Sequence, residues 1–259
     1  MPQRFIKMKQ EGEKIAALTA YDATTARLLE AASIDCILVG DSLGMVVKGE
    51  KDTLNVQLEE TLYHVRAVVA GAPQTFVIGD MPFATFQQSP QQAFANAAKI
   101  LAAGAAMVKI EGGSNLAETV HFLTQRGIPV CAHVGLMPQT VRASGGYHVQ
   151  GRGNQAEQVE NDAQQMQDAG AAMVVLEMLP QTLSASISEK LQIPTIGIGG
   201  GNVCDGQILV IYDMLGMSAQ QLRFVRNFLA DSGSVADAIR AYITAVKDGS
   251  FPAQQHSID

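Results

Sequence analysis

Short apolar segments alternate along the chain with longer stretches in which apolar residues recur at helical spacing. The short segments are rich in β-branched residues and are bounded by glycine, proline or polar residues, which is typical of buried strands. Strands that alternate with helices form βα units around a parallel sheet, so the pattern predicts an α/β fold. Eight segments have this pattern, and we predict strands over Ile15 to Thr19, Cys36 to Gly40, Phe76 to Gly79, Met107 to Ile110, Val130 to His133, Met173 to Leu176, Thr195 to Ile198 and Ile208 to Ile211.

Helix boundaries between the predicted strands agree with this interpretation. Ser89 and Pro90 offer an N-cap and a proline at the first helical position, and Gly104 ends the same helix. Eight strands with helices between them in 259 residues match a (β/α)8 TIM barrel better than an open doubly wound sheet. We expect one barrel domain over residues 1–259, with a short N-terminal extension and a flexible tail from Phe251 to Asp259.

The composition excludes several classes of function. Lys and Arg number 18 against 25 Asp and Glu, so the net charge is -7, and no basic cluster suits a nucleic acid. Three scattered cysteines form no CxxC pair, which indicates a reducing compartment, and we expect a cytoplasmic protein. No apolar run approaches the roughly 20 residues that span a bilayer, so no membrane association is expected.

Acidic residues follow most of the predicted strands. Asp22, Asp41, Asp80, Glu111 and Glu177 lie at or just after strand ends, and His133 ends a further strand. In a parallel barrel these ends open on one face, where carboxylates repel one another unless a cation lies among them. Oxygen ligands without thiolates suit Mg²⁺. The alternative is that an Asp in this position caps the following helix, which applies above all to Asp22 and Asp41.

Lys109 precedes Glu111 by two residues, so in a strand both side chains point to the barrel interior. Lys109 then needs an anionic partner, which could be Glu111 or a substrate carboxylate. A Schiff-base role is the third alternative, and a metal ion at the same mouth favours the electrostatic roles over it.

Glu177 lies between apolar residues, and such surroundings suit a general base. The alternatives are that Glu177 is a second metal ligand or that it forms an ion pair with Lys109 across the barrel. The segments 103–111 and 169–177 resemble each other, whether by a quarter-barrel repeat or by convergence of two βα units, and this places Glu111 and Glu177 at equivalent strand ends.

Two connections are rich in glycine. The first, from Pro138 to Asn154, is too long for a minimal connection and predicts an ordered functional loop or lid. The second, from Gly197 to Asn202, does not match the dinucleotide-binding pattern. It fits a phosphate-binding loop and a tight turn equally well.

Several motifs together resemble one enzyme family. Read in chain order over about Thr19 to Pro252, the sequence is similar to ketopantoate hydroxymethyltransferase, also called 3-methyl-2-oxobutanoate hydroxymethyltransferase. The motifs that carry the resemblance are Ala20-Tyr21-Asp22, Val39-Gly40-Asp41-Ser42-Leu43-Gly44-Met45, Asp80-Met81-Pro82-Phe83, Met107-Val108-Lys109-Ile110-Glu111-Gly112-Gly113, Gly146-Tyr147-His148-Val149-Gln150-Gly151-Arg152-Gly153 and Gly206-Gln207-Ile208-Leu209-Val210.

The resemblance implies a barrel of the phosphoenolpyruvate/pyruvate superfamily that assembles as a homo-oligomer, a decamer in this family. It implies a Mg²⁺-dependent enzyme that transfers a hydroxymethyl group from the co-substrate 5,10-methylenetetrahydrofolate to 3-methyl-2-oxobutanoate, giving 2-dehydropantoate in pantothenate biosynthesis. Motif by motif, the metal ligands are Asp41, Asp80 and Glu111, the last directly or through water; the substrate-binding residues are Asp41, Ser42, Asp80 and Lys109; and the proton acceptor is Glu177.

Two rival functions remain at this point. A lyase of the same superfamily would break a carbon–carbon bond in a 2-oxo acid and would need no folate. A barrel without catalytic activity would bind a metabolite and leave the acids at the strand ends without a chemical role.

Overall fold

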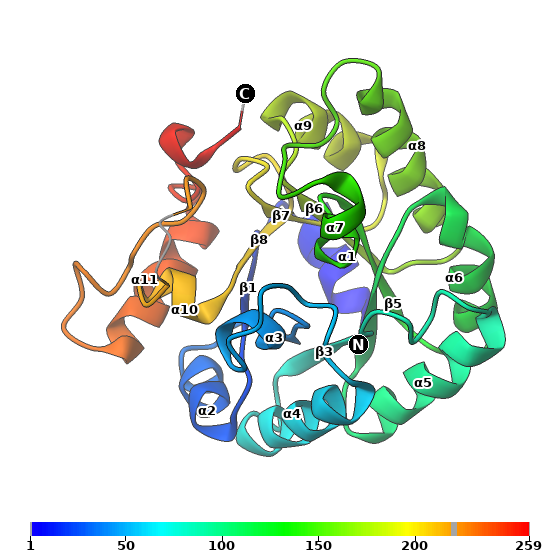
Figure 1. Ribbon diagram of the computed structural model, residues 1–259. Coiled ribbons are helices and arrows are strands. Elements are labelled where there is room, and N and C mark those ends of the chain that lie inside the picture. The colour runs from blue at the N-terminus through cyan, green and yellow to red at the C-terminus, as the bar shows by residue number, and fades with distance from the viewer. Residues whose placement is uncertain (1, 219–221, 259) are drawn as a thin grey trace.

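The computed structural model describes residues 2–218 and 222–258 of the chain. Eight parallel strands close into a barrel in the order of the sequence, with helices around the outside (Figure 1), which confirms the predicted fold. The strands are β1 (Ile15–Thr19), β2 (Cys36–Val39), β3 (Phe76–Asp80), β4 (Met107–Glu111), β5 (Val130–Gly135), β6 (Met173–Glu177), β7 (Thr195–Ile198) and β8 (Gly206–Leu209).

The helices connect and surround these strands. Within the described residues, no helix is long and apolar enough to cross a membrane. The α-helices are α1 (Gln3–Gln10), α2 (Ala23–Ala31), α3 (Leu43–Val46), α4 (Leu58–Gly71), α5 (Pro90–Ala102), α6 (Ala117–Thr124), α7 (Val141–Ser144), α8 (Gln155–Asp168), α9 (Gln181–Lys190), α10 (Ile211–Met214) and α11 (Val235–Lys247), and the 3-10 helices are η1 (Ser114–Leu116), η2 (Pro138–Thr140) and η3 (Gln254–His256).

Several strands continue beyond their predicted ends, because the polar residue after the apolar run still pairs with its neighbour. Asp80 pairs in register with Lys109, Glu111 with His133, and Glu177 with Gly135. The strand predicted over Ile208 to Ile211 was misplaced. The pairing starts at Gly206, opposite Ile15, and Ile211 begins α10.

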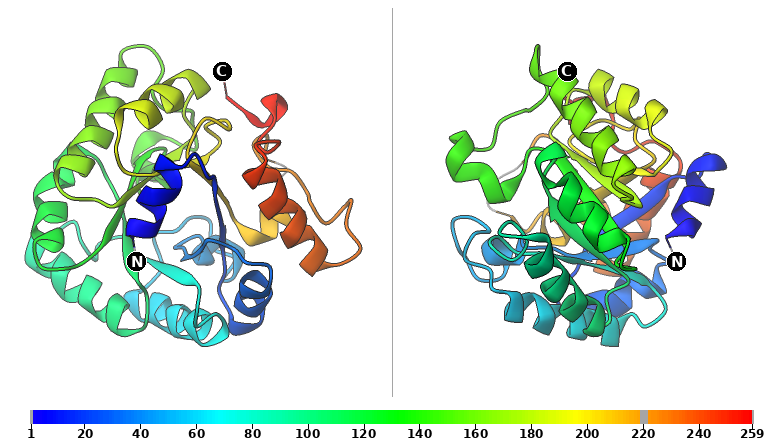
Figure 2. Two further views of the ribbon diagram at one scale, coloured as in Figure 1. Left: turned by 180° about the vertical axis from the view of Figure 1, so that it is seen from behind. Right: turned by 90° about the vertical axis from the view of Figure 1, so that its right-hand side faces the viewer.

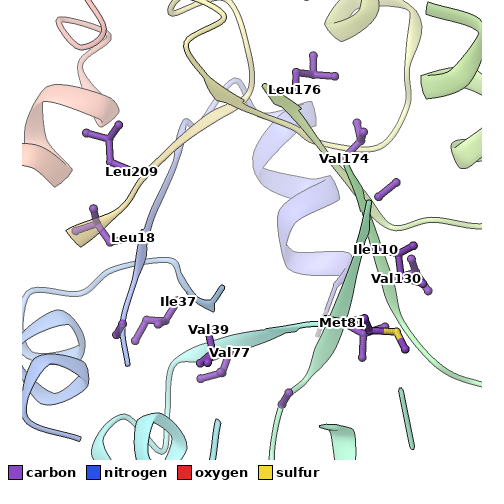
Figure 3. Close-up of a cluster of buried hydrophobic side chains, with 14 of the residues drawn as sticks. Leu18, Ile37, Val39, Val77, Met81, Ile110, Val130, Val174, Leu176 and Leu209 are labelled. Atoms are coloured by element: carbon purple, nitrogen blue, oxygen red, sulfur yellow. The ribbon is translucent and has the colours of Figure 1, made fainter. Parts of the chain in front are cut away.

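The two faces of each strand build two separate apolar layers. One face packs outward against the helices, and Figure 3 shows part of this layer, including Leu18, Val77 and Val174. The other face fills the barrel interior with alanine, cysteine, methionine and branched residues, among them Ala17, Cys131 and Met173. Toward the carboxyl ends of the strands, the inward-pointing residues become polar. The alternation of side chains along each strand therefore fills the barrel interior and also brings the charged side chains together at one mouth.

The predicted N-terminal extension contains α1, which covers the opposite end of the barrel. Phe5 and Met8 are buried among residues from the strands, and the rings of Phe5 and Phe76 meet edge to face with centroids 5.0 Å apart. Seen from behind (Figure 2, left), α1 lies across the centre of the barrel, and the right-hand view places it at the far end from α7. The acid-bearing mouth is therefore the end that α1 leaves uncovered.

The C-terminal segment packs against the barrel, which contradicts the expected flexible tail for the part that the structure describes. Phe251 is 2% exposed and Ile258 is 5% exposed. The ring of Phe251 lies 5.3 Å from that of Phe228, and Gln181 N donates to Ile258 O at 2.8 Å. The polar residues between these two apolar anchors give the segment the composition of a free tail. Asp259 lies outside the described residues.

One hydroxyl joins α11 to the barrel wall. Tyr242 is fully buried, and its Oη lies 2.9 Å from Ala17 O and 3.1 Å from Gln207 O. We expect Tyr242→Phe to lower the free energy of unfolding by about 1–2 kcal/mol, because buried carbonyls lose a donor. Urea unfolding measures this change. The matched control is Tyr63→Phe, whose ring is 65% exposed and which should change stability by less than about 0.5 kcal/mol. Equal effects of both substitutions would show that the buried hydroxyl contributes nothing.

Candidate active site

An ion-pair cluster occupies the open mouth of the barrel. Lys109 Nζ lies 2.8 Å from Asp80 Oδ1 and 3.5 Å from Glu111 Oε1, and all three side chains are buried. The contact with Asp80 is an ion pair without the angle of a hydrogen bond. The predicted shared face of Lys109 and Glu111 is thus confirmed, and β3 adds Asp80 to it.

His133 extends this cluster toward β6. Its Nδ1 lies 3.5 Å from Glu111 Oε1, and its Nε2 approaches Glu177 Oε2 to 3.2 Å as an ion pair. Burial and the charge of Lys109 oppose protonation, but the two carboxylates outweigh both and raise the pKa of His133 to about 9. The raised pKa favours the protonated ring, which lies between Glu111 and Glu177 with Lys109 Nζ 3.4 Å from its Nδ1. The Glu177 side chain is 15% exposed, more than any other acid of the cluster, so a substrate in the mouth can reach it.

Asp41 joins the cluster from the end of β2. Its backbone N donates to Asp80 Oδ2 at 3.1 Å, and its Oδ2 accepts a hydrogen bond of 3.0 Å from Gln139 Nε2. The neighbouring Ser42 Oγ lies 2.8 Å from the hydroxyl of Tyr21. Asp41 and Asp80 are thus adjacent, as the metal-site prediction requires, and Ser42 lies beside them.

The charges within the cluster are unequally balanced. Burial, together with the charges of Asp80 and Glu111, raises the pKa of Asp41 well above its ordinary value. Burial also raises the pKa of Asp80, even though Lys109 acts against it. For Glu111 burial acts to raise the pKa, but Lys109 and His133 prevail and lower it to about 2. The pKa of Asp41 is raised further than that of Asp80, whose carboxylate has Lys109 Nζ 2.8 Å away.

The oxygen donors of these residues are of the type that binds a small divalent cation. Asp41 and Asp80 could hold such an ion, because an added positive charge would relieve their mutual repulsion. Both oxygens of Glu111 already have protein partners, Oε2 from the backbone N of Gln139 at 2.9 Å and Oε1 from Lys109, so Glu111 fits a contact through water. Within residues 2–218 and 222–258, three or more acid, His or Cys side chains nowhere form a preformed metal cage.

Gln139 is a site residue that sequence analysis missed. It is buried, with 4% of its surface exposed, and donates to both Asp41 and Glu111. A lone glutamine in a glycine-rich connection has no periodicity or motif that would single it out. Its position directly after Pro138, at the start of the predicted lid, is the only local signal.

Asp22 does not belong to the cluster and is the N-cap of α2, as the alternative interpretation held. Its Oδ1 accepts hydrogen bonds from Thr24 N at 2.8 Å and Thr25 N at 2.9 Å. Burial acts to raise the pKa of Asp22, but the hydrogen bonds from Thr25 and Thr24 prevail and lower it.

The glycine run after β7 forms a closely packed turn. Gly199 and Gly201 have φ values of 76° and 80°, and a Cβ on Gly201 would lie 2.7 Å from Gln181 Cγ. Lys14 Nζ donates to the carbonyls of Asn202 and Cys204 at 3.1 and 2.6 Å. These contacts favour the turn over the phosphate-binding loop, because the lysine beside the run is engaged by backbone carbonyls.

The fold and the acid-lined mouth define the class of protein: a (β/α)8 barrel with the fold of the phosphoenolpyruvate mutase/isocitrate lyase superfamily. Among solved structures, the chain is similar to 2,3-dimethylmalate lyase of that superfamily, with a TM-score of 0.61 and 17% identity over 83% of this chain and 82% of that one. It is also similar to a putative phosphonomutase from Burkholderia cenocepacia J2315, with a TM-score of 0.65 and 13% identity over 83% and 93% of the two chains.

The chain belongs to the ketopantoate hydroxymethyltransferase family of enzymes, whose family model matches residues 1–254. The 3-methyl-2-oxobutanoate hydroxymethyltransferase of Nitrosomonas europaea is 57% identical over 250 residues, which cover 96% of this chain and 93% of that one. The enzyme of the same name from Neisseria meningitidis is 52% identical over 251 residues, which cover 96% and 95%. These relatives confirm the resemblance drawn from the sequence motifs.

The cap at Asp22 gives a stability prediction that separates it from the cluster. We expect Asp22→Ala to cost about 1 kcal/mol of unfolding free energy, since two backbone N–H groups of α2 lose their acceptor. Because the pKa of Asp22 is lowered in the folded state, its contribution is present above the ordinary carboxylate range and is lost as the pH falls through the folded value. Unfolding curves between about pH 2 and pH 7 measure both effects. Asp22→Asn is the matched control, which keeps an acceptor but removes the titration. A pH dependence unchanged in Asp22→Asn would contradict this assignment.

Proposed function

We propose that this protein transfers a hydroxymethyl group from 5,10-methylenetetrahydrofolate to 3-methyl-2-oxobutanoate and so forms 2-dehydropantoate for pantothenate biosynthesis. Family membership supports this substrate pair. The observation that carries the proposal is the position of Glu177. It is the most accessible carboxylate of an otherwise buried charged cluster, and its partner is His133 at 3.2 Å.

In this proposal Glu177 is the general base. It removes the hydrogen on C3 of the 2-oxo acid and so forms the enolate. Water hydrolyses both carbon–nitrogen bonds of the folate methylene bridge, so tetrahydrofolate leaves with a proton on each of N5 and N10 and the one-carbon unit keeps the oxygen of the water. The enolate attacks this carbon, and its oxygen takes the proton that Glu177 accepted and becomes the hydroxyl. His133 holds the Glu177 carboxylate in place, because its Nε2 lies 3.2 Å from Glu177 Oε2.

We propose further that Asp41 and Asp80 hold Mg²⁺ directly and that Glu111 binds it through water. When bound, the ion polarises the ketone of the substrate and so acidifies the hydrogen on C3. Asp41, Ser42, Asp80 and Lys109 contact the substrate in this proposal.

In this proposal Lys109 acts on the substrate through its positive charge. Burial acts to lower the pKa of Lys109, but Asp80, Glu111 and Asp41 prevail and raise it, so the amine stays protonated. A protonated amine is no nucleophile, which argues against the Schiff-base alternative. A cytoplasmic homo-oligomer, a decamer as the resemblance implies, completes the proposal; the buried, unpaired cysteines accord with a reducing compartment.

The base is tested by Glu177→Gln, which preserves shape but removes the proton acceptor. We expect turnover to fall by about a hundredfold or more. Exchange of the C3 hydrogen of 3-methyl-2-oxobutanoate with deuterated water, followed by NMR in the presence of Mg²⁺, isolates the proton-transfer step. Glu157→Gln on the exterior of α8 is the matched control and should exchange at the unsubstituted rate. Exchange by Glu177→Gln at that same rate would assign the base elsewhere.

Removal of divalent cations tests the metal and distinguishes the rival lyase. We expect a chelator to abolish formation of 2-dehydropantoate and added Mg²⁺ to restore it, since the ketone then regains its polarising group. Mass spectrometry of the products, with each substrate omitted in turn, measures this. Product that forms from the 2-oxo acid without folate would indicate a carbon–carbon lyase. Activity that survives complete chelation would refute the role of the ion.

A further inference from the structure

The connection that sequence analysis predicted as a lid is attached to the active site at both of its ends. This segment, residues 138–154, is here called the mouth loop; it contains η2 and α7 and lies in front of the barrel mouth in Figure 1. Near its start, Gln139 contacts Asp41 and Glu111. Near its end, Gln150 N donates at 3.0 Å to the carbonyl of Met178, the residue after Glu177. The mouth loop therefore links the proposed metal ligands to the proposed base.

The side chain of Gln139 is the buried anchor of this loop. Its Nε2 donates to Asp41 Oδ2 and to Met81 O, both at 3.0 Å, and its Oε1 accepts from Gln87 Nε2 at 3.1 Å. The amide nitrogen thus faces two acceptors, and the amide oxygen faces a donor. A reversed amide would place an oxygen against the Asp41 carboxylate, so the contacts fix its orientation.

One residue of the loop therefore holds acids from two different strands. The side chain of Gln139 binds Asp41 beyond β2, and its backbone N binds Glu111 of β4 at 2.9 Å. Hydrogen bonds to an ionised acceptor are stronger than neutral ones, and they restrict the rotation of the carboxylates. If the loop leaves the mouth, both acids lose a donor in the same event.

Two further contacts hold the middle of the mouth loop. Arg142 Nε reaches Asp52 Oδ2 at 2.7 Å; the Asp52 side chain is 9% exposed but that of Arg142 is 65% exposed, so water screens one side of this pair. Tyr147, which is half-exposed, donates its hydroxyl to the sulfur of Met45 at 3.4 Å. The docked position of the loop start consequently depends on Gln139 more than on these surface contacts.

We infer that Gln139 is a positioning residue that orients Asp41 and Glu111 for a divalent cation and couples binding of that cation to docking of the mouth loop. The inference rests on the proposed function, because it takes Asp41 and Glu111 as the metal-site acids. Linkage makes the coupling reciprocal: a docked loop tightens cation binding, and a bound cation holds the loop down.

The test is Gln139→Met, which keeps the length of the side chain and removes its donors. Mg²⁺ binding to the full-length protein, measured by titration calorimetry, should weaken on the order of tenfold, as is usual when a residue supporting a metal ligand is lost. Trypsin cleavage after Arg142, followed by mass spectrometry, reports loop docking separately. Mg²⁺ should slow this cleavage in the unsubstituted protein and no longer do so in Gln139→Met. Gln165→Met, on the exposed face of α8, is the matched control and should change neither readout.

A second variant covers the case in which Gln139→Met does not fold. Gln87→Leu leaves Gln139 in place and removes the donor that orients its amide, so both readouts should shift in the same direction by a smaller factor. Mg²⁺ affinity within twofold of the unsubstituted protein, with cleavage still slowed by Mg²⁺, would overturn the inference alone. Absence of any Mg²⁺ binding by the unsubstituted protein would overturn the proposed metal site, and the inference with it.

Discussion

The rest of the site depends on one interaction, the ion pairing of the buried Lys109 ammonium group with Asp80 and Glu111. Removing charged groups from water costs several kcal/mol each, and only close pairing offsets that cost. Each buried charge is consequently compensated by its neighbours: Lys109 by two carboxylates, Glu111 by Lys109 and His133, and Asp41 by the Nε2 donor of Gln139. The cluster behaves as one charged unit, and loss of any member leaves its neighbours buried without compensation.

The position of this unit follows from strand geometry. Alternate residues of β3, β4, β5 and β6 point inward, and the register brings Asp80 beside Lys109 and Glu111 beside His133. Toward the amino ends of these strands the inward-pointing residues are apolar, and α1 covers that end of the barrel. One end is thus a packed core and the other a charged cavity mouth, although both arise from one period-two pattern.

The sequence predicted the barrel and most of the site because both depend on local pattern. The strand-end pattern alone left open whether Asp22 joins Asp80 in the cluster or caps the next helix, since each follows an apolar run. The difference lies in register: Asp80 still pairs with Lys109 and points inward, whereas Asp22 comes three residues after β1 has ended and turns to cap α2. Gln139 and the start of β8 escaped prediction for a related reason. Both depend on partners distant in the chain: Gln139 on Asp41, and the start of β8 on β1, where Ile15 pairs with Gly206.

The order of exposure within the cluster accounts for the division of roles in the proposed reaction. Asp41, Asp80 and Glu111 are buried and fixed, which suits groups that must hold a charge in one place, whereas Glu177 is partly exposed and meets the substrate. When Glu177 accepts the C3 proton, its negative charge passes to the substrate oxygen, and the total charge of the mouth does not change. Around His133 the change is local: the contact with Glu177 Oε2 loses its negative charge, whereas Glu111 Oε1 at 3.5 Å and Lys109 Nζ at 3.4 Å remain beside the ring. The buried acids therefore keep their partners during the proposed proton transfer, and only the partly exposed member of the cluster changes its charge.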